Sequence, residues 1–529
     1  MCKRPIILLI ALAVIAGLPV VTGAQISDKT GVTSLEQYFD MLSSENFDIA
    51  GDMWVPSALE RSARFGITYD DVLLKVDCAS PVIRHFELLR YQLQPPVKRY
   101  EILGDSSWSK LEFSKLVNEG RSEHMYYMQR HENWYWLNFP QDYYARDWKV
   151  VESEYFRVHV DPRVEPFLND ATLNESDRFV AAMCDTLGIP DDLRDRIARE
   201  KIEYFYCGDD SLVKEITGHR IRGTVDLPSN DIISAAFPHF HELTHLLVNI
   251  RLQTLPLYTL PLLREGTAVR LGGRWGKHAA PLMELAVFLY REKIVELDSI
   301  LTMKDFDNNS SADIVYPLAG VVSGFMIDRM GMDDYLEAYR RASGPFNRLY
   351  AMTAEDVRQL LMEATGYKTW QAFVTELEGY MDDLTANATA RPGGLDNGKA
   401  LAAADGYSVQ MYKDWLAFEF VGTDTATPPR GILLFGKNDG LTGQQSSLFK
   451  EQTSNGAVPE GYRYGVQFDQ NEAGLYDYAT NQLLAKYIWG ITPSPDYFDA
   501  EKGTVRICFK KDILKKTLPE SGHCTLVRQ

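Results

Sequence analysis

The sequence predicts a multidomain α+β protein with a central region in which strands precede helices. The chain has 529 residues, of which 45% are hydrophobic and 12% aromatic, a composition typical of globular proteins. At roughly 100–200 residues per domain, this length indicates two to four domains. Apolar residues alternate along short segments near both ends and follow a helical period through much of the middle.

Residues 1–24 are predicted to be a secretory signal peptide. A basic pair precedes an apolar run over residues 6–21, and small residues follow up to Ala24. The alternative is an uncleaved anchor helix, but the run is barely long enough to span a bilayer and contains Gly17 and Pro19. We therefore expect an exported protein (periplasmic, cell-surface or extracellular) with no stable membrane span after signal cleavage.

The charge and the cysteines of the chain argue against a nucleic-acid partner, a disulfide framework and a thiolate zinc site. The net charge of −18 repels phosphate backbones, so nucleic acid is not an expected partner. Only five cysteines follow residue 24, an odd and sparse set that does not indicate a disulfide framework, and no CxxC pair is present, so a zinc site built from thiolates is not expected.

Residues 25–150 are predicted to form an N-terminal α+β domain. A helix is expected over residues 34–42, and the aromatic-rich alternating segments around Tyr127 and Tyr135 are typical of a curved sheet. This part contains no motif that carries chemistry.

Residues 151–386 are predicted to form an α+β unit. Strands are expected at 154–160, 201–207 and around 220–226. The expected helices cover 176–187, 237–250, 263–272, 282–297, 319–329 and 332–341, and a capping box at Thr353 opens one more.

The remainder is predicted to be a linker and a β-sandwich. Residues 387–399, which include Pro392, Gly393 and Gly394, are typical of a linker. Residues 400–529 contain short alternating segments separated by turn residues, which indicates a C-terminal β-sandwich. The expected strands are 415–421, 431–435, 462–468, 486–490 and 503–509.

The run His241-Glu242-Leu243-Thr244-His245 is an HExxH zinc motif. Histidines four residues apart on a helix share one face, so both imidazoles can bind one ion, and the glutamate lies close enough to contact a water at that ion. A zinc site of this kind needs a third protein ligand and an open position. Glu265, which opens a second helical segment twenty residues later, is the candidate, because the connection is long enough to let the second helix cross the first.

The motifs resemble those of the gluzincin zinc metallopeptidases, the HExxH-plus-Glu class. The pentapeptide HELTH is the one thermolysin uses, Glu265-Gly266-Thr267-Ala268 is similar to the E-G-x-A segment of aminopeptidase-like members, and the segment from Tyr316 to Gly320 resembles Y-x-x-A-G. The resemblance covers about residues 155–384. It implies a thermolysin/aminopeptidase-like catalytic domain, a mixed sheet followed by helices, that hydrolyses peptide or protein substrates.

Carried onto this sequence, the resemblance implies one Zn²⁺ bound by His241, His245 and Glu265, with Glu242 as general base and Tyr316 as a hydroxyl donor to the oxyanion. The chain departs from the family at three places, one of which is Val321-Val322 in place of the usual Ser-Phe after Y-x-x-A-G. It lacks the G-x-M-E-N type segment that binds a free amino terminus, and Val269 replaces the aspartate that supports the first histidine in thermolysin.

Simpler structural interpretations remain for several of these residues. Tyr316 is as compatible with a packed aromatic side chain, Glu265 with an ordinary acid at a helix start, and His239 with a structural histidine. The segment around 220–226 is either one more strand or an edge on which a peptide pairs. The alternative function is an exported binding protein with a catalytically silent scaffold and a β-sandwich that grips carbohydrate or protein through aromatics such as Trp415, Tyr462 and Trp489.

Overall fold

The computed structural model describes most of the chain beyond the predicted signal peptide. The described residues are 30–84, 97–103, 107–117, 120–132, 134–274, 276–308, 312–389, 398–404, 406–412, 415–421, 430–437, 443, 445–454, 456–469, 472–488, 498–499, 504–514, 519 and 523–528. Among them, no helix combines the length and the apolar character needed to cross a membrane. The signal peptide and residues 390–397 of the predicted linker lie outside this range.

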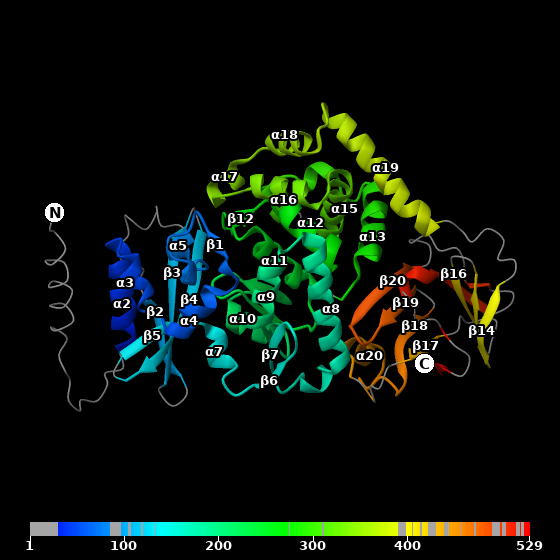
Figure 1. Cartoon of the computed structure of the whole chain (residues 1–529), viewed down its shortest axis with the longest axis horizontal. Helices are drawn as coiled ribbons and strands as arrows, with labels where there is room; N and C mark the ends of the chain where they lie inside the picture. The colour runs from blue at the N-terminus through cyan, green and yellow to red at the C-terminus, as the bar shows by residue number, and fades with distance from the viewer. Residues whose placement is uncertain are drawn as a thin grey trace. The chain divides into compact units, whose positions relative to one another are not determined.

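The chain divides into two compact units, each containing helices and sheets, which confirms the mixed α+β class (Figure 1). The first unit contains the chain up to Pro56 together with His85–Phe139, and the second contains Ser57–Arg84 together with Pro140–Gln529. The chain therefore enters the second unit, returns to the first and leaves it again before the predicted boundary at residue 150. Each unit is therefore built from two segments that are separated in the sequence.

The first unit combines helices with an antiparallel sheet. Its sheet has the order β2-β3-β4-β5. The helix expected over residues 34–42 lies inside α2, and its Tyr38 is fully buried against Trp54 and Tyr126, with ring centroids 6.4 and 6.0 Å away. The elements are α2 (Thr30–Ser43), α3 (Phe47–Gly51), β2 (Val97–Leu103), β3 (Trp108–Val117), β4 (Gly120–His131) and β5 (Trp134–Asn138).

The second unit opens with a five-stranded sheet of order β6-β7-β8-β10-β9. Its strands are β6 (Lys149–Glu152), β7 (Phe156–Val160), β8 (Ile202–Tyr206), β9 (Gly223–Asp226) and β10 (Asp231–Ser234). The strands β7, β8 and β10 are parallel, whereas β9 pairs antiparallel with β10 and forms one edge. The expected strands correspond to β7, β8 and β9. Strands β6 and β10 are absent from the predictions, because each has only four residues and two adjacent apolar residues that break the alternation.

Helices lie between the strands of this sheet and after its last strand along the chain, and each predicted helix overlaps an observed one. The long helices are α8 (Asp170–Leu187), α9 (Asp191–Glu200), α11 (Phe240–Leu252), α12 (Pro261–Gly272), α13 (Ala279–Arg291), α15 (Ala312–Met330), α16 (Met332–Arg341), α18 (Ala354–Thr365) and α19 (Trp370–Thr389). The capping box before α18 is present, since Thr353 accepts from the Asp356 backbone and Asp356 from the Thr353 backbone. Helix α19 extends past the predicted domain boundary at residue 386.

Shorter elements connect these parts. They are α4 (Pro56–Ser62), β1 (Thr68–Tyr69), α5 (Pro81–Arg84), α7 (Pro140–Tyr144), α10 (Asp210–Thr217), β11 (Thr254–Leu255), β12 (Tyr258–Thr259), α14 (Met303–Asn308), β13 (Ser343–Gly344) and α17 (Phe346–Ala351). Strand β1 pairs with β11, which joins the segment Ser57–Arg84 to the region after α11.

Two antiparallel five-stranded sheets share one core at the C-terminus, the arrangement of a β-sandwich. Buried residues from both sheets, such as Phe418 and Phe435, meet in that core. The sheets contain β14 (Lys399–Ala404), β15 (Tyr407–Met411), β16 (Trp415–Val421), β22 (Thr504–Lys510) and β21 (Phe498–Asp499), and β20 (Gln482–Ile488), β19 (Glu472–Asp477), β18 (Tyr462–Phe468), β17 (Gly431–Lys437) and β23 (Cys524–Arg528), with α20 (Ser447–Gln452) between β17 and β18. All five expected strands overlap these. Trp415 is buried, and Trp489 lies outside the described residues.

This sandwich also contacts the segment that follows α12. The Leu483 amide of β20 donates to the Gly276 carbonyl, and the Leu483 carbonyl accepts from the His278 amide at 2.8 Å. Nearby, the Asn481 side chain donates to the Phe237 carbonyl just before α11.

Candidate metal centre

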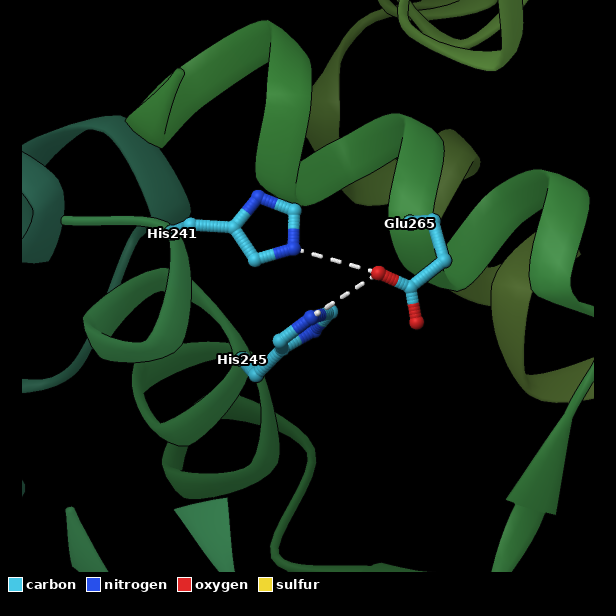
Figure 2. Close-up of side chains that lie close together, drawn as sticks. All are labelled: His241, His245 and Glu265. Carbon is cyan, nitrogen blue, oxygen red and sulfur yellow. Dashed lines mark hydrogen bonds and ion pairs between the residues drawn. The ribbon is translucent and has the colours of Figure 1, made fainter. Parts of the chain in front are cut away.

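Helices α11 and α12 bring three potential metal ligands together (Figure 2). The histidines at 241 and 245 project from one face of α11 toward Glu265 of α12. One carboxylate oxygen, Oε2 of Glu265, lies 3.1 Å from Nε2 of His241 and 3.4 Å from Nε2 of His245. The three ligand atoms lie within 4.8 Å of one another, and the crossing expected from the sequence is present.

The hydrogen bond made by Nδ1 of His241 determines which tautomer its neutral ring adopts. Nδ1 lies 2.8 Å from the carbonyl oxygen of Gly273, which can only accept, so Nδ1 carries the hydrogen. In the neutral ring, Nε2 then presents a lone pair to Oε2 of Glu265. Two lone pairs at this separation repel each other unless a proton or a cation lies between them.

The other oxygen of Glu265 is held by an arginine. Nε of Arg264 donates to Oε1 at 2.8 Å. Burial alone would raise the pKa of Glu265, but the positive charge of Arg264, together with His245, outweighs burial and holds this pKa well below its ordinary value. Glu265 is therefore a buried carboxylate that stays ionised and can bind a cation.

Glycines place α12 and α15 close enough to form the site. A Cβ on Gly266 would lie 2.4 Å from the backbone oxygen of Ala319, and one on Gly320 would lie 2.5 Å from a methyl carbon of Val269. The two segments that carry the gluzincin resemblance are thus the contact surface of these helices. Glu265 directly precedes Gly266, and Tyr316 lies four residues before Gly320. The contact between these glycine segments therefore fixes the position of Glu265 relative to Tyr316.

Gly273 requires glycine for a separate reason. It ends α12 with a φ of +72°, and a Cβ there would lie 2.2 Å from the Lys277 carbonyl oxygen. Its carbonyl supports His241, which is the role that the sequence left unassigned because Val269 replaces an aspartate.

The three ligands lie in the wall of a cavity of about 530 Å³. Glu242 and Tyr316 line the same cavity, as do residues 220–225, which lead into and form the start of the edge strand β9. The structure therefore brings all five sequence-predicted site residues to one cavity, together with the segment considered for peptide pairing.

Two residues beside the ligands have shifted pKa values: Glu242, which is partly buried, and His239, which is buried. Burial raises the pKa of Glu242 above its ordinary value, although His241 opposes the shift. Burial also lowers the pKa of His239, with a further contribution from His241. Nδ1 of His239 lies 2.9 Å from Oγ of Ser234, and its Nε2 lies 4.0 Å from Oε1 of Glu242. His239 is thus a neutral wall residue next to the predicted base.

The ring of Tyr316 lies close to two aromatic rings and to the guanidinium of an arginine. Its ring centroid lies 6.2 Å from that of His241 and 5.4 Å from that of Phe306, and the guanidinium carbon of Arg274 lies 3.7 Å from it. Burial, aided by the negative charge of Glu265, raises the pKa of Tyr316 to about 12. The phenol therefore keeps its proton near neutral pH and can donate a hydrogen bond.

Three contributors to the site are missing from the sequence predictions. Arg264 adjoins a predicted ligand, and Gly273 belongs to a glycine pair that ends a helix, a signal that predicts the helix end but not the bond to His241. Arg274 has no signal of its own, since its place over Tyr316 depends on the crossing of α12 and α15.

The donor set fits zinc. Two neutral imidazole nitrogens and one carboxylate oxygen are a known three-ligand set for catalytic zinc. Ligand atoms around a tetrahedral ion with bonds of about 2.0–2.1 Å lie roughly 3.3 Å apart. The separations of 3.1 and 3.4 Å from Oε2 of Glu265 to the two histidines bracket that value, and all three ligand atoms lie within 4.8 Å of one another.

Comparison with known proteins adds no family assignment. No protein-family model matches the chain, and a search of curated proteins gives no significant match.

Proposed function

We propose that this chain is an exported zinc-dependent peptidase of the gluzincin class. The observation that carries the proposal is the convergence of two imidazole nitrogens and one ionised carboxylate oxygen in the wall of a cavity that Glu242 also lines. Zinc bound there would polarise the carbonyl of a peptide bond and lower the pKa of a water molecule.

The residues of the chain would then divide the remaining work. Glu242 takes a proton from the attacking water and returns it to the leaving amine as the C–N bond breaks. Tyr316 donates a hydrogen bond to the carbonyl oxygen as that atom gains negative charge. Gly273 and Arg264 orient the first histidine and the ligand carboxylate.

The edge strand supports an extended peptide as substrate. Strand β9 pairs with β10 along one side, and its residues up to Val225 line the cavity. An extended peptide can add to such an edge through main-chain hydrogen bonds and so lie across the zinc ligands.

The replacement Glu242→Gln tests the mechanism. We expect the variant to bind zinc as the wild type does and to lose about 10²–10⁴-fold in kcat, because the amide cannot accept the proton. Zinc content is measured by mass spectrometry, and hydrolysis on a diverse peptide library with and without chelator. Glu376→Gln, on the exposed face of α19, is the matched control.

Two outcomes would change the conclusion. A fully active Glu242→Gln protein would remove this residue as the base. Zinc binding by the wild type without hydrolysis of any peptide in the library would instead favour a binding protein with a silent scaffold.

A further inference from the structure

The cavity extends beyond the three potential ligands along one face of α11. His241, His245 and Asn249 follow one another at intervals of four residues, and all three line the cavity. Four residues correspond to about 6 Å along a helix, so Asn249 lies roughly that far beyond His245. Leu255 of β11, the strand that follows α11, also lines the cavity. Part of the cavity therefore lies away from the metal cluster, near the C-terminal end of α11.

Tyr69 of β1 belongs to the wall at that end. It pairs with Leu255, and the amide of the next residue, Asp70, donates to the Leu255 carbonyl at 3.3 Å. Nζ of Lys75 lies 5.8 Å from the centroid of the Tyr69 ring and donates to the carbonyl of Leu227, which also lines the cavity. The backbone pairing and the ammonium group therefore hold Tyr69 in position.

The hydroxyl of Tyr69 has no hydrogen-bond partner among the residues that the structure describes, and Tyr69 is only 7% exposed. Buried hydroxyls without a partner destabilise a protein and are uncommon. Burial raises the pKa of this phenol well above its ordinary value, so the hydroxyl keeps its proton and can both donate and accept a hydrogen bond. A bound molecule with a polar group at this place would supply the missing partner.

The wall near Tyr69 is largely apolar. Its strand partner Leu255 and the nearby Leu257 are buried and line the cavity, and Leu227 lines it as well. A charged group would lose its hydration against these side chains, whereas an apolar group gains by leaving water. Tyrosine is the amino acid that combines a large apolar side chain with a neutral hydroxyl at its end. The wall therefore fits a tyrosine side chain.

We propose that the Tyr69 hydroxyl binds the hydroxyl of a tyrosine in the peptide substrate, so that the protein cleaves peptide bonds close to tyrosine. This inference rests on the peptidase function proposed above and names a substrate class for it. One residue of an extended peptide spans about 3.3–3.6 Å, so the recognised tyrosine lies within about two residues of the cleaved bond. Phenylalanine at the same place would leave the Tyr69 hydroxyl without a partner, and a mismatch of this kind discriminates between substrates.

The kinetic test uses matched peptides of the best-cleaved library sequence, with Tyr, Phe or Leu at each position within two residues of the cleaved bond. At one position we expect kcat/KM to favour Tyr over Phe by about 10-fold, which corresponds to about 1.4 kcal/mol. Tyr69→Phe should reduce this ratio to about one by slowing cleavage of the Tyr peptide. Tyr367→Phe, the matched control, removes another buried hydroxyl that has no partner among the described residues but does not line the cavity, and it should keep the ratio.

The melting temperature separates recognition of the substrate from a structural role. Because the Tyr69 hydroxyl bonds to none of the described residues, Tyr69→Phe should keep the zinc content and should not lower the melting temperature. A clear decrease in the melting temperature would show that the hydroxyl is bonded within the protein, and this result would overturn the inference.

A binding measurement distinguishes failure of this inference from failure of the proposed function. The zinc-loaded Glu242→Gln protein should bind the Tyr peptide more tightly than the Phe peptide, and Tyr69→Phe in that background should remove the difference. If the wild type hydrolyses no library peptide, the peptidase proposal fails, and the same comparison on the most tightly bound peptide decides the tyrosine site. Equal values for the Tyr and Phe peptides at every position, or an unchanged preference in Tyr69→Phe, overturns the role of Tyr69.

Discussion

Two clusters of buried charge in the second unit differ in how their atoms are satisfied. Around Asp231, which is fully buried, every contact joins a donor to an acceptor: Arg64 and Gln141 donate to its two oxygens, and Arg61 lies 3.3 Å away. Around Glu265, one oxygen faces two imidazole nitrogens, of which that of His241 carries no hydrogen in the neutral ring.

This difference separates a structural ion network from a candidate site. Both clusters contain buried charge, so burial of charge alone does not distinguish a structural ion network from a candidate site. Acceptors that converge on one point favour binding of a cation, whereas the two carboxylate oxygens of Asp231 already accept hydrogen bonds from donors of the protein.

The largest expected effect comes from removing one imidazole. His245→Ala should reduce the zinc content from about one ion per chain to near none, because a two-ligand site binds weakly. Hydrolysis should then fall to background. Chelation should lower the melting temperature of the wild type but leave that of the variant unchanged, since there is no bound ion to lose. Unchanged zinc in the variant would count against His245 as a ligand, and His131→Ala, at an exposed position, is the control.

Removing the carboxylate of the other cluster should affect stability instead of metal binding. Asp231→Ala leaves Arg64 and Arg61 without their shared partner and should lower the free energy of unfolding by about 3–5 kcal/mol. Zinc per folded molecule should stay the same. Asp333→Ala removes the exposed partner of Arg251 and should cost at most about 1 kcal/mol. Urea unfolding compares the two variants, and equal losses would contradict the contrast.

A smaller effect is expected at the edge of the metal cluster. Tyr316→Phe keeps the ring under Arg274 but removes the hydroxyl, so kcat should fall about 10²-fold while zinc content stays constant. The control is Tyr350→Phe, because Tyr350 is exposed and lies outside the cavity. An unchanged kcat would assign Tyr316 to packing, the alternative considered from the sequence.

Local patterns predicted the convergence of the three potential ligands better than the connectivity of the fold. Helical spacing was enough to place His241 and His245 on one face, and the distance along the chain to Glu265 was enough to suggest a crossing helix. The sequence did not predict that Ser57–Arg84 belongs to the second unit, because this placement depends on contacts between distant residues. One example is the contact of Arg64 with Asp231, 167 residues apart. The bond from His241 to Gly273 was equally hidden, since every residue has a carbonyl and only the fold selects one.

The segment that follows α12 belongs to two regions at once. Gly273 at its start orients His241, and Gly276 and His278 further along are bonded to Leu483 on the edge of the C-terminal sheets. A displacement of that edge would reach the imidazole through a few backbone bonds. Under the proposed function, we expect a substitution that displaces this edge of the sandwich to change turnover without contacting the substrate.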